Sequence, residues 1–210
     1  MQRIVAFNRV SVDGYFAAPD GSLGWVVPDP ELDRSVMASA DRVAATTTGP
    51  EPGTILFGRR TYDMFESFWP KALDPSGPET SPDPHGPGRA SVEMRVMAIW
   101  INAARKLVFS RTRTSVTWSN SHLLREFDPR EVEAMKRRPG GGILVFGSGS
   151  IASLLTQHRL IDEYQFVVSP LLLGDGRSLI GGVPKSLRLE LLEAKPFPSG
   201  NVMLRYAPGP

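Results

Sequence analysis

The chain of 210 residues is 41% hydrophobic and 22% charged, as expected for an ordinary soluble globular protein with a single domain over residues 1–210. The formal net charge of +2 does not indicate a nucleic-acid partner, and the lack of cysteine excludes disulfides, thiolate metal sites and a cysteine nucleophile. No apolar run approaches the roughly 20 residues of a membrane-spanning helix. We therefore expect a cytoplasmic enzyme or binding protein without a membrane or metal partner.

The first expected strand covers residues 4–10 and ends in the turn SVDGY at 11–15. Asp13 in this turn is the first candidate for catalysis, although an aspartate before glycine more often hydrogen-bonds its own loop. An aspartate with its usual pKa is a poor acid at neutral pH, so a catalytic role would require burial. Trp25 follows a second turn at 18–21 and is expected either to cover a ligand or to pack in the core.

A first helix is expected from Pro30, with Asp29 as its cap, because apolar residues follow at helical spacing. Those residues are Leu32, Val36, Ala40 and Val43. The Gly49–Pro50 pair is expected to terminate the segment.

A buried strand at 54–57 runs directly into Gly58, Arg59, Arg60 and Thr61, at the start of a second helix. A helix N-terminus carries partial positive charge, so two arginines there are unfavourable unless an anion binds. A bound phosphate would remove this conflict. The alternative is that both arginines are solvated and Thr61 only caps the helix.

Residues 69–90 are rich in proline and glycine and have no apolar periodicity, which is typical of a surface loop. Residues 94–101 fit a short helix or an extended segment equally well. The following strand, at 106–109, ends in Ser110, Arg111 and Thr112. Hydroxyls and an arginine at the end of a strand suit a ribose phosphate, because the guanidinium can make bidentate contacts. Residues 116–118 are expected to add a short fourth strand.

The segment ILVFGSGSIASLL at 143–155 combines a strand buried on both faces, a turn of small residues and the start of a helix that contains Ile151. The turn consists of Gly147, Ser148, Gly149 and Ser150. It lets a phosphate approach the free N–H groups of the helix start. The spacing also fits the Rossmann fingerprint, but the next acidic residues, Asp162 and Glu163, come too early to hold a ribose. A tight turn without a ligand is the remaining alternative.

A helix capped by Asp128 precedes this segment, and a strand at 164–168 follows it. Two alternating segments, at 187–194 and 202–206, are expected to form a C-terminal β-hairpin. The order of elements therefore predicts an α/β protein with a mostly parallel sheet and an antiparallel end.

Three strands of this sheet are followed by turns that suit phosphate, and ligands of open α/β sheets bind at the carboxyl ends of strands. Together the turns indicate an extended ligand with phosphates at more than one point. NADPH suits them better than NADH, because Arg111 offers a partner for the 2′-phosphate, where an acidic residue would favour the free hydroxyl.

Several segments, in this order, resemble the dihydrofolate-reductase-like family, which includes the reductase domain of bacterial riboflavin biosynthesis. They are SVDGYFAAPDG, FGRRTYDMF, LVFSRT, ILVFGSGSIASLL and DEYQFVVSPLLLGDGRSLI. The resemblance covers nearly the whole chain. It implies a central mixed sheet with helices on both faces, NADPH laid across the strand ends, and a homodimer. It also places residues 58–61 at the cofactor phosphates, 110–112 at the adenosine 2′-phosphate, 147–151 at the pyrophosphate and nicotinamide, and Asp13 beside the nicotinamide and substrate.

Two departures from the family's pattern concern the substrate. Riboflavin reductases carry an acidic residue before the glycines, where this chain has Phe146, and the deaminase domain usually fused to them is not found in this sequence. Dihydrofolate reductases carry a proton-donating carboxylate on the first helix, and neither Asp33 nor Asp41 has the surrounding pattern.

We therefore expect an NADPH-dependent reductase that transfers hydride to a C=N or C=O bond of a small, pterin- or pyrimidine-like heterocycle. Asp13 is the polar group expected nearest to the hydride. The residues expected to contact the substrate also include Asn8, Tyr15, Trp25 and Pro170. The alternative from another class is a protein that binds or senses NADP(H) on the same fold without turnover.

Overall fold

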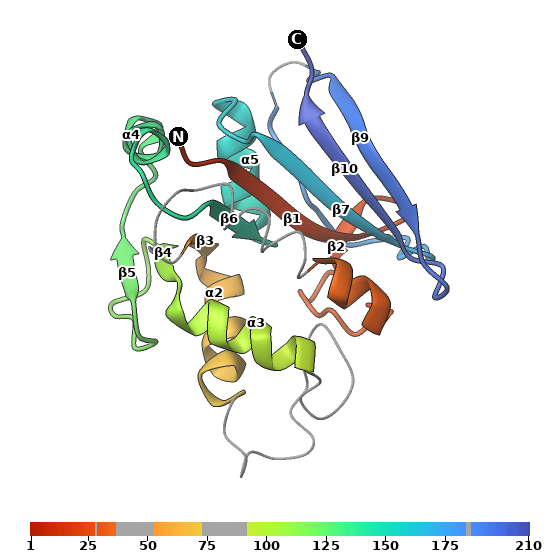
Figure 1. Ribbon diagram of the computed structural model, residues 1–210, viewed down its shortest axis with the longest axis horizontal. Helices are drawn as coiled ribbons and strands as arrows, with labels where there is room; N and C mark the ends of the chain where they lie inside the picture. The colour runs from red at the N-terminus through yellow and green to blue at the C-terminus, as the bar shows by residue number, and fades with distance from the viewer. Residues whose placement is uncertain (28, 37–52, 73–91, 184–185) are drawn as a thin grey trace.

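The computed structural model describes residues 1–27, 29–36, 53–72, 92–183 and 186–210. The strands of its central sheet are β1 (Ile4–Ser11), β3 (Thr54–Gly58), β4 (Arg105–Phe109), β5 (Ser121–Leu124), β6 (Ile143–Phe146), β7 (Glu163–Ser169), β9 (Leu189–Pro196) and β10 (Val202–Pro208). They lie in the order β5-β4-β3-β6-β1-β7-β10-β9 (Figure 1). Neighbouring strands from β5 to β7 are parallel, and β10 is antiparallel to both β7 and β9. The expected mostly parallel sheet with an antiparallel hairpin is confirmed.

Helices cover both faces of this sheet, as expected. They are α2 (Arg59–Phe68), α3 (Val92–Ala103), α4 (Pro129–Arg137) and α5 (Gly149–Gln157), together with the helical residues 30–36. Successive strand residues point to opposite faces, so Phe57 packs in one apolar cluster and its neighbour Leu56 in the other. The first cluster includes side chains of α2, α3 and residues 30–36, and the second includes side chains of α4 and α5.

The beginning of the first helix agrees with its predicted cap. The Asp29 carboxylate accepts hydrogen bonds from the backbone N–H groups of Glu31 at 2.9 Å and Leu32 at 3.0 Å. Leu32 is buried. The continuation expected through Ala40 and Val43, and the Gly49–Pro50 pair, lie outside the described residues.

The prediction of a strand at 116–118 is wrong, because the next strand of the sheet after β4 is β5, at Ser121–Leu124. The backbone N–H groups of Thr117 and Trp118 donate to the Glu66 carboxylate at 3.1 and 3.2 Å. This segment therefore bonds to a side chain of α2 and not to a neighbouring strand.

The loop expected at 69–90 begins with a short 3₁₀-helix, η1 (Trp69–Lys71), in which Trp69 is buried. Residues 73–90 lie outside the described part of the chain. Residues 94–101, ambiguous by sequence, belong to helix α3. None of the helices formed by the described residues is long and apolar enough to cross a membrane.

Candidate functional site

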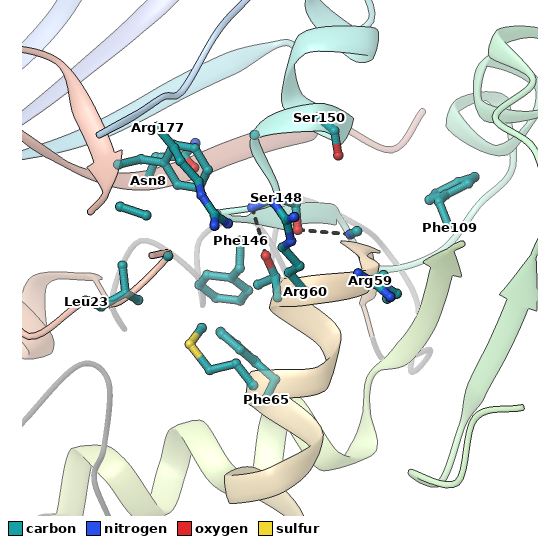
Figure 2. A pocket seen from close by; sticks show the side chains of 18 of the residues that line it. Asn8, Leu23, Arg59, Arg60, Phe65, Phe109, Phe146, Ser148, Ser150 and Arg177 are labelled. Carbon is teal, nitrogen blue, oxygen red and sulfur yellow. Dashed lines mark hydrogen bonds between the residues drawn. The ribbon is translucent and has the colours of Figure 1, made fainter. Parts of the chain in front are cut away.

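A cavity of about 440 Å³ opens at the carboxyl-terminal ends of β4, β3, β6 and β1 (Figure 2). Small-molecule and cofactor sites have volumes of about 300–1,000 Å³. The expected cofactor residues that line the cavity are Gly58, Arg59, Arg60, Thr61, Ser110, Arg111, Thr112, Gly147, Ser148, Gly149 and Ser150. Three turns that are far apart in the sequence meet there, because parallel strands present their carboxyl ends at one edge of the sheet.

Two helices begin at the cavity without a capping side chain. Gly58 is the N-cap residue of α2 and Ser148 that of α5, and neither provides a side-chain cap hydrogen bond. The first turn of each helix also lacks an acidic residue. Both positive helix ends are therefore available to an anion.

Cationic side chains surround these helix ends. Arg59 and Arg60 are exposed at the start of α2, and Arg111 is exposed after β4. Within the described part of the chain, none of the three forms an ion pair, and no Asp or Glu lines the cavity. The cavity therefore attracts anionic ligands.

Ser148 joins two of the three turns. Its N–H donates to Thr61 Oγ1 at 3.1 Å, and its own Oγ accepts from the N–H of Gly58 at 3.0 Å (Figure 2). It adopts a left-handed conformation with φ of 49°, which is uncommon for residues other than glycine. At Gly149, an added Cβ would lie 2.9 Å from a ring carbon of Phe16, so a larger residue at position 149 would displace the Phe16 ring from the start of α5. The hydroxyls expected at the phosphates thus hold the two turns together.

The third turn, at residues 110–113, is shaped by the Ser110 hydroxyl. This hydroxyl accepts hydrogen bonds from the N–H groups of Thr112 at 3.3 Å and Arg113 at 3.0 Å. Ser110 is itself buried, while Arg111 and Thr112 remain exposed. Ser110 therefore orients the turn, and the two following side chains are presented to the cavity.

The same turn is attached to helix α2 through Glu66. The Arg113 guanidinium pairs with both Glu66 and Asp63, and Thr117 Oγ1 donates to Glu66 at 2.7 Å. Partial burial acts to raise the pKa of Glu66. The hydrogen bonds from Thr117, Arg113 and Tyr62 outweigh burial and lower this pKa to about 2. Sequence analysis did not find this network, because its members come from α2 and a loop about 50 residues later.

We expect Glu66→Gln to destabilise the protein at neutral pH and to do so much less in acid. The pKa of Glu66 is 4.5 in the unfolded chain and about 2 in the folded one, so its stabilisation is complete above pH 4.5 and disappears as the pH falls towards 2. Urea unfolding of both proteins across this window measures the effect, with Glu133→Gln on the exposed face of α4 as control. A stability difference that does not shrink on acidification would contradict the assignment.

Asp13 does not line the cavity. Its carboxylate accepts hydrogen bonds from Ser11 Oγ at 2.6 Å and from the N–H groups of Leu173 at 3.1 Å and Gly174 at 2.8 Å. The bond from Ser11, with those from the two backbone groups, lowers the pKa of Asp13. The residue is exposed, so the burial that a proton donor would require is absent. Asp13 connects the turn after β1 to the loop after β7.

Four other predicted site residues lie outside the cavity lining. Tyr15 is half-buried on the short strand β2 (Tyr15–Ala17), and Trp25 is half-buried in the following loop. Pro170 is exposed after β7, close to Gly200. Ile151 is buried in the cluster formed with α4 and α5. Asn8, by contrast, lines the cavity.

The cavity also includes residues that sequence analysis missed. They are Phe7, Arg9, Phe16, Ala17, Gly21, Leu23, Met64, Phe65, Phe109 and Arg177. Arg177 belongs to β8 (Arg177–Ser178), which pairs with β2 and thereby reaches the cavity. The sequence GDGR at 174–177 offered an arginine in a turn as a signal for a binding residue, but the pairing of β8 with β2 is not visible in the sequence. Asp33, a carboxylate on the first helix, forms an ion pair of 2.7 Å with Arg9. Arg9 lines the cavity, and Asp33 does not.

A mostly parallel sheet with an antiparallel C-terminal hairpin and helices on both faces is the fold of the dihydrofolate-reductase-like class, and the cavity lies across the ends of its strands. Residues 2–203 match the RibD C-terminal domain family, and the chain belongs to this family. The resemblance seen in the sequence is confirmed.

Individual relatives are distant. The uncharacterized protein YyaP of Bacillus subtilis strain 168 is 24% identical over 209 residues, which are 98% of this chain and 94% of that protein. A putative riboflavin biosynthesis protein from Shewanella sp. PV-4 has a TM-score of 0.69 and 22% identity, with 100% of both chains covered. Dihydrofolate reductase from Enterococcus faecalis, complexed with NADP(H) and RAB-propyl, has a TM-score of 0.58 and 10% identity, covering 99% of this chain and 97% of that one. The two structures share the fold of this chain.

Proposed function

We propose that the protein is an NADPH-dependent reductase that transfers hydride to a C=N or C=O bond of a small heterocycle of the pterin or pyrimidine kind. One observation carries the proposal: two uncapped helix N-termini meet three arginines that have no ion pair within the described residues, in one cavity. This arrangement suits a ligand with phosphates at more than one point.

The position of each turn along the sheet supports an assignment of cofactor groups. Strands β3 and β6 separate β4 from β1, so an extended ligand in the cavity would span from Arg111 after β4 to Asn8 on β1. We assign Arg111 to the 2′-phosphate. Arg59, Arg60 and the N–H groups at the starts of α2 and α5 would hold the other phosphates.

NADPH, when bound, supplies a hydride from C4 of the nicotinamide. The chain supplies the surroundings in which a planar ring can be held. Side chains of Leu23, Phe65 and Phe146 line the cavity as apolar surfaces (Figure 2), and Met64 adds to them. Such surfaces position an aromatic heterocycle by contact, and a few polar groups orient it.

The proton for the reduced bond is assigned to water. Arginines are the ionisable side chains that line the cavity in the described part of the chain, and an arginine does not release its proton at neutral pH. Because the ionisable side chains among the described lining residues are arginines, which donate no proton at neutral pH, the cavity also supports a second candidate function. This second function is a protein that binds or senses NADP(H) without turnover.

Titration of the purified protein with NADPH and NADH tests the proposed cofactor. We expect NADPH to bind at least about tenfold more tightly, since a single charge-assisted contact to the 2′-phosphate accounts for such a ratio. A panel of pterins, pyrimidines and other cyclic imines and ketones is then screened for NADPH oxidation by loss of nicotinamide absorbance. Binding without oxidation by any compound would favour the sensing protein. Failure to bind either dinucleotide would contradict both functions.

A further inference from the structure

Asn8 occupies a position on β1 where the sheet is open on one side. β1 pairs with β7 as far as Ser11, but with β6 only as far as Phe7. The chain then turns away from β6 at Gly147, whose N–H donates to the carbonyl of Phe7 at 3.1 Å. Asn8 is therefore the first residue of β1 beyond the last β6 pair, and it borders the cavity at this opening (Figure 2).

The side-chain amide of Asn8 is buried and lacks a hydrogen-bond partner in the described part of the chain. The residue is 2% exposed, and neither Nδ2 nor Oδ1 has a hydrogen-bond partner among the described residues. Buried polar groups are normally paired, because burial removes their bonds to water. An unpaired amide at the edge of a ligand cavity therefore indicates a group that a ligand satisfies.

Other buried or half-buried asparagines of this chain are paired, which sets Asn8 apart. Asn201 accepts from Ser169 Oγ at 2.9 Å and donates to the carbonyl of Val27 at 3.2 Å and to Ser199 Oγ at 2.9 Å. Asn102 likewise bonds through both of its polar atoms. The fold thus satisfies asparagine amides where they serve the structure.

We propose that Asn8 is a specificity-determining residue, which pairs with a planar amide edge of the ligand bound in the cavity. An asparagine amide presents one donor and one acceptor side by side, and a cis arrangement of C=O and N–H matches both with two hydrogen bonds. The nicotinamide carboxamide presents such an edge, and so does the lactam of an oxo-pyrimidine or oxo-pterin ring. The proposal rests on the proposed function, because it takes the cavity as the cofactor and substrate site.

The first test separates a ligand-binding role from a structural one. Asn8→Leu removes both polar atoms and keeps the branching and the number of heavy atoms of the side chain. We expect its melting temperature to equal or exceed that of the wild-type protein, because the Asn8 side chain makes no hydrogen bond to the described residues that the substitution could remove. Asn201→Leu is the matched control and is expected to lower the melting temperature. A loss of stability in Asn8→Leu as large as that in Asn201→Leu would overturn the proposal.

The second test identifies the source of the amide edge by calorimetry on the wild-type protein and Asn8→Leu. One arm compares NADP⁺ with its 3-acetylpyridine analogue, in which a methyl group replaces the carboxamide NH₂. The other arm compares uracil with 1,3-dimethyluracil, which keeps the carbonyls and lacks the N–H donors. We expect the wild-type protein to prefer the amide-bearing ligand in one arm by about tenfold to a hundredfold, and Asn8→Leu to lose that preference.

A preference in the first arm assigns Asn8 to the cofactor carboxamide, and a preference in the second assigns it to the substrate ring. A wild-type protein without either preference, or a preference that persists in Asn8→Leu, would overturn the proposal. Failure of the proposed function has a different signature, since the wild-type protein would then bind neither dinucleotide. The uracil arm and the melting temperatures still test Asn8 in that case.

Discussion

Arg111→Ala is expected to weaken NADPH binding by about tenfold to a hundredfold and to leave NADH binding nearly unchanged. Arg111 is exposed at the carboxyl end of β4, lines the cavity and has no ion pair among the described residues. Its guanidinium is therefore available to a 2′-phosphate, which only NADPH carries. Fluorescence or calorimetric titration with both dinucleotides measures the two dissociation constants.

The matched control is Arg130→Ala, which removes an exposed arginine of α4 that does not line the cavity. This variant tests whether the lost affinity reflects only a change in net charge. Equal losses for NADPH and NADH in Arg111→Ala would refute the assignment of Arg111 to the 2′-phosphate. They would indicate instead that the residue contacts a group that both dinucleotides share.

Lys106→Ala is expected to destabilise the protein by about 3 kcal/mol. Lys106 is fully buried, and its ammonium donates to the carbonyls of Asn102, Ala104 and Ser119 at 3.0, 2.8 and 3.1 Å. It also lies 4.4 Å from the centre of the Trp118 ring. Since Asn102 and Ala104 are at the C-terminal end of α3, the truncation leaves helix-end carbonyls without this donor and creates a cavity.

The pH dependence of this effect has a defined direction. Burial lowers the pKa of Lys106 from 10.5 to about 8, so between these values the unfolded chain binds more protons than the folded one. The contribution of Lys106 to the free energy of unfolding therefore rises with pH across that window. The difference in stability between the wild-type protein and Lys106→Ala widens accordingly. Urea unfolding near each end of the window measures it. Lys71→Ala, on the exposed surface of η1, serves as control, and a difference that narrows with rising pH would contradict the assignment.

Local patterns were sufficient for the elements that build the cavity. The run from Ile143 to Phe146 is apolar at every position, and it forms a strand buried along its whole length. Asp29 and Asp128 cap helices as predicted, because a cap depends on residues only two or three positions away. The prediction of a strand at 116–118 was wrong, since the backbone N–H groups of Thr117 and Trp118 donate to the Glu66 side chain of α2 and not to a neighbouring strand.

The sequence by itself determined the α/β order of elements, the family and the turns that bring arginines and helix starts to one edge of the sheet. These features follow from short-range periodicity, and from the rule that parallel strands end together. Only the tertiary structure decided which polar groups remain for a ligand. The Asp13 carboxylate accepts hydrogen bonds from the loop after β7, and the Glu66 carboxylate forms an ion pair with Arg113. The Asn8 amide, by contrast, is unpaired among the described residues. Whether a buried polar atom finds a partner depends on segments that are distant in the chain, which a local pattern does not contain.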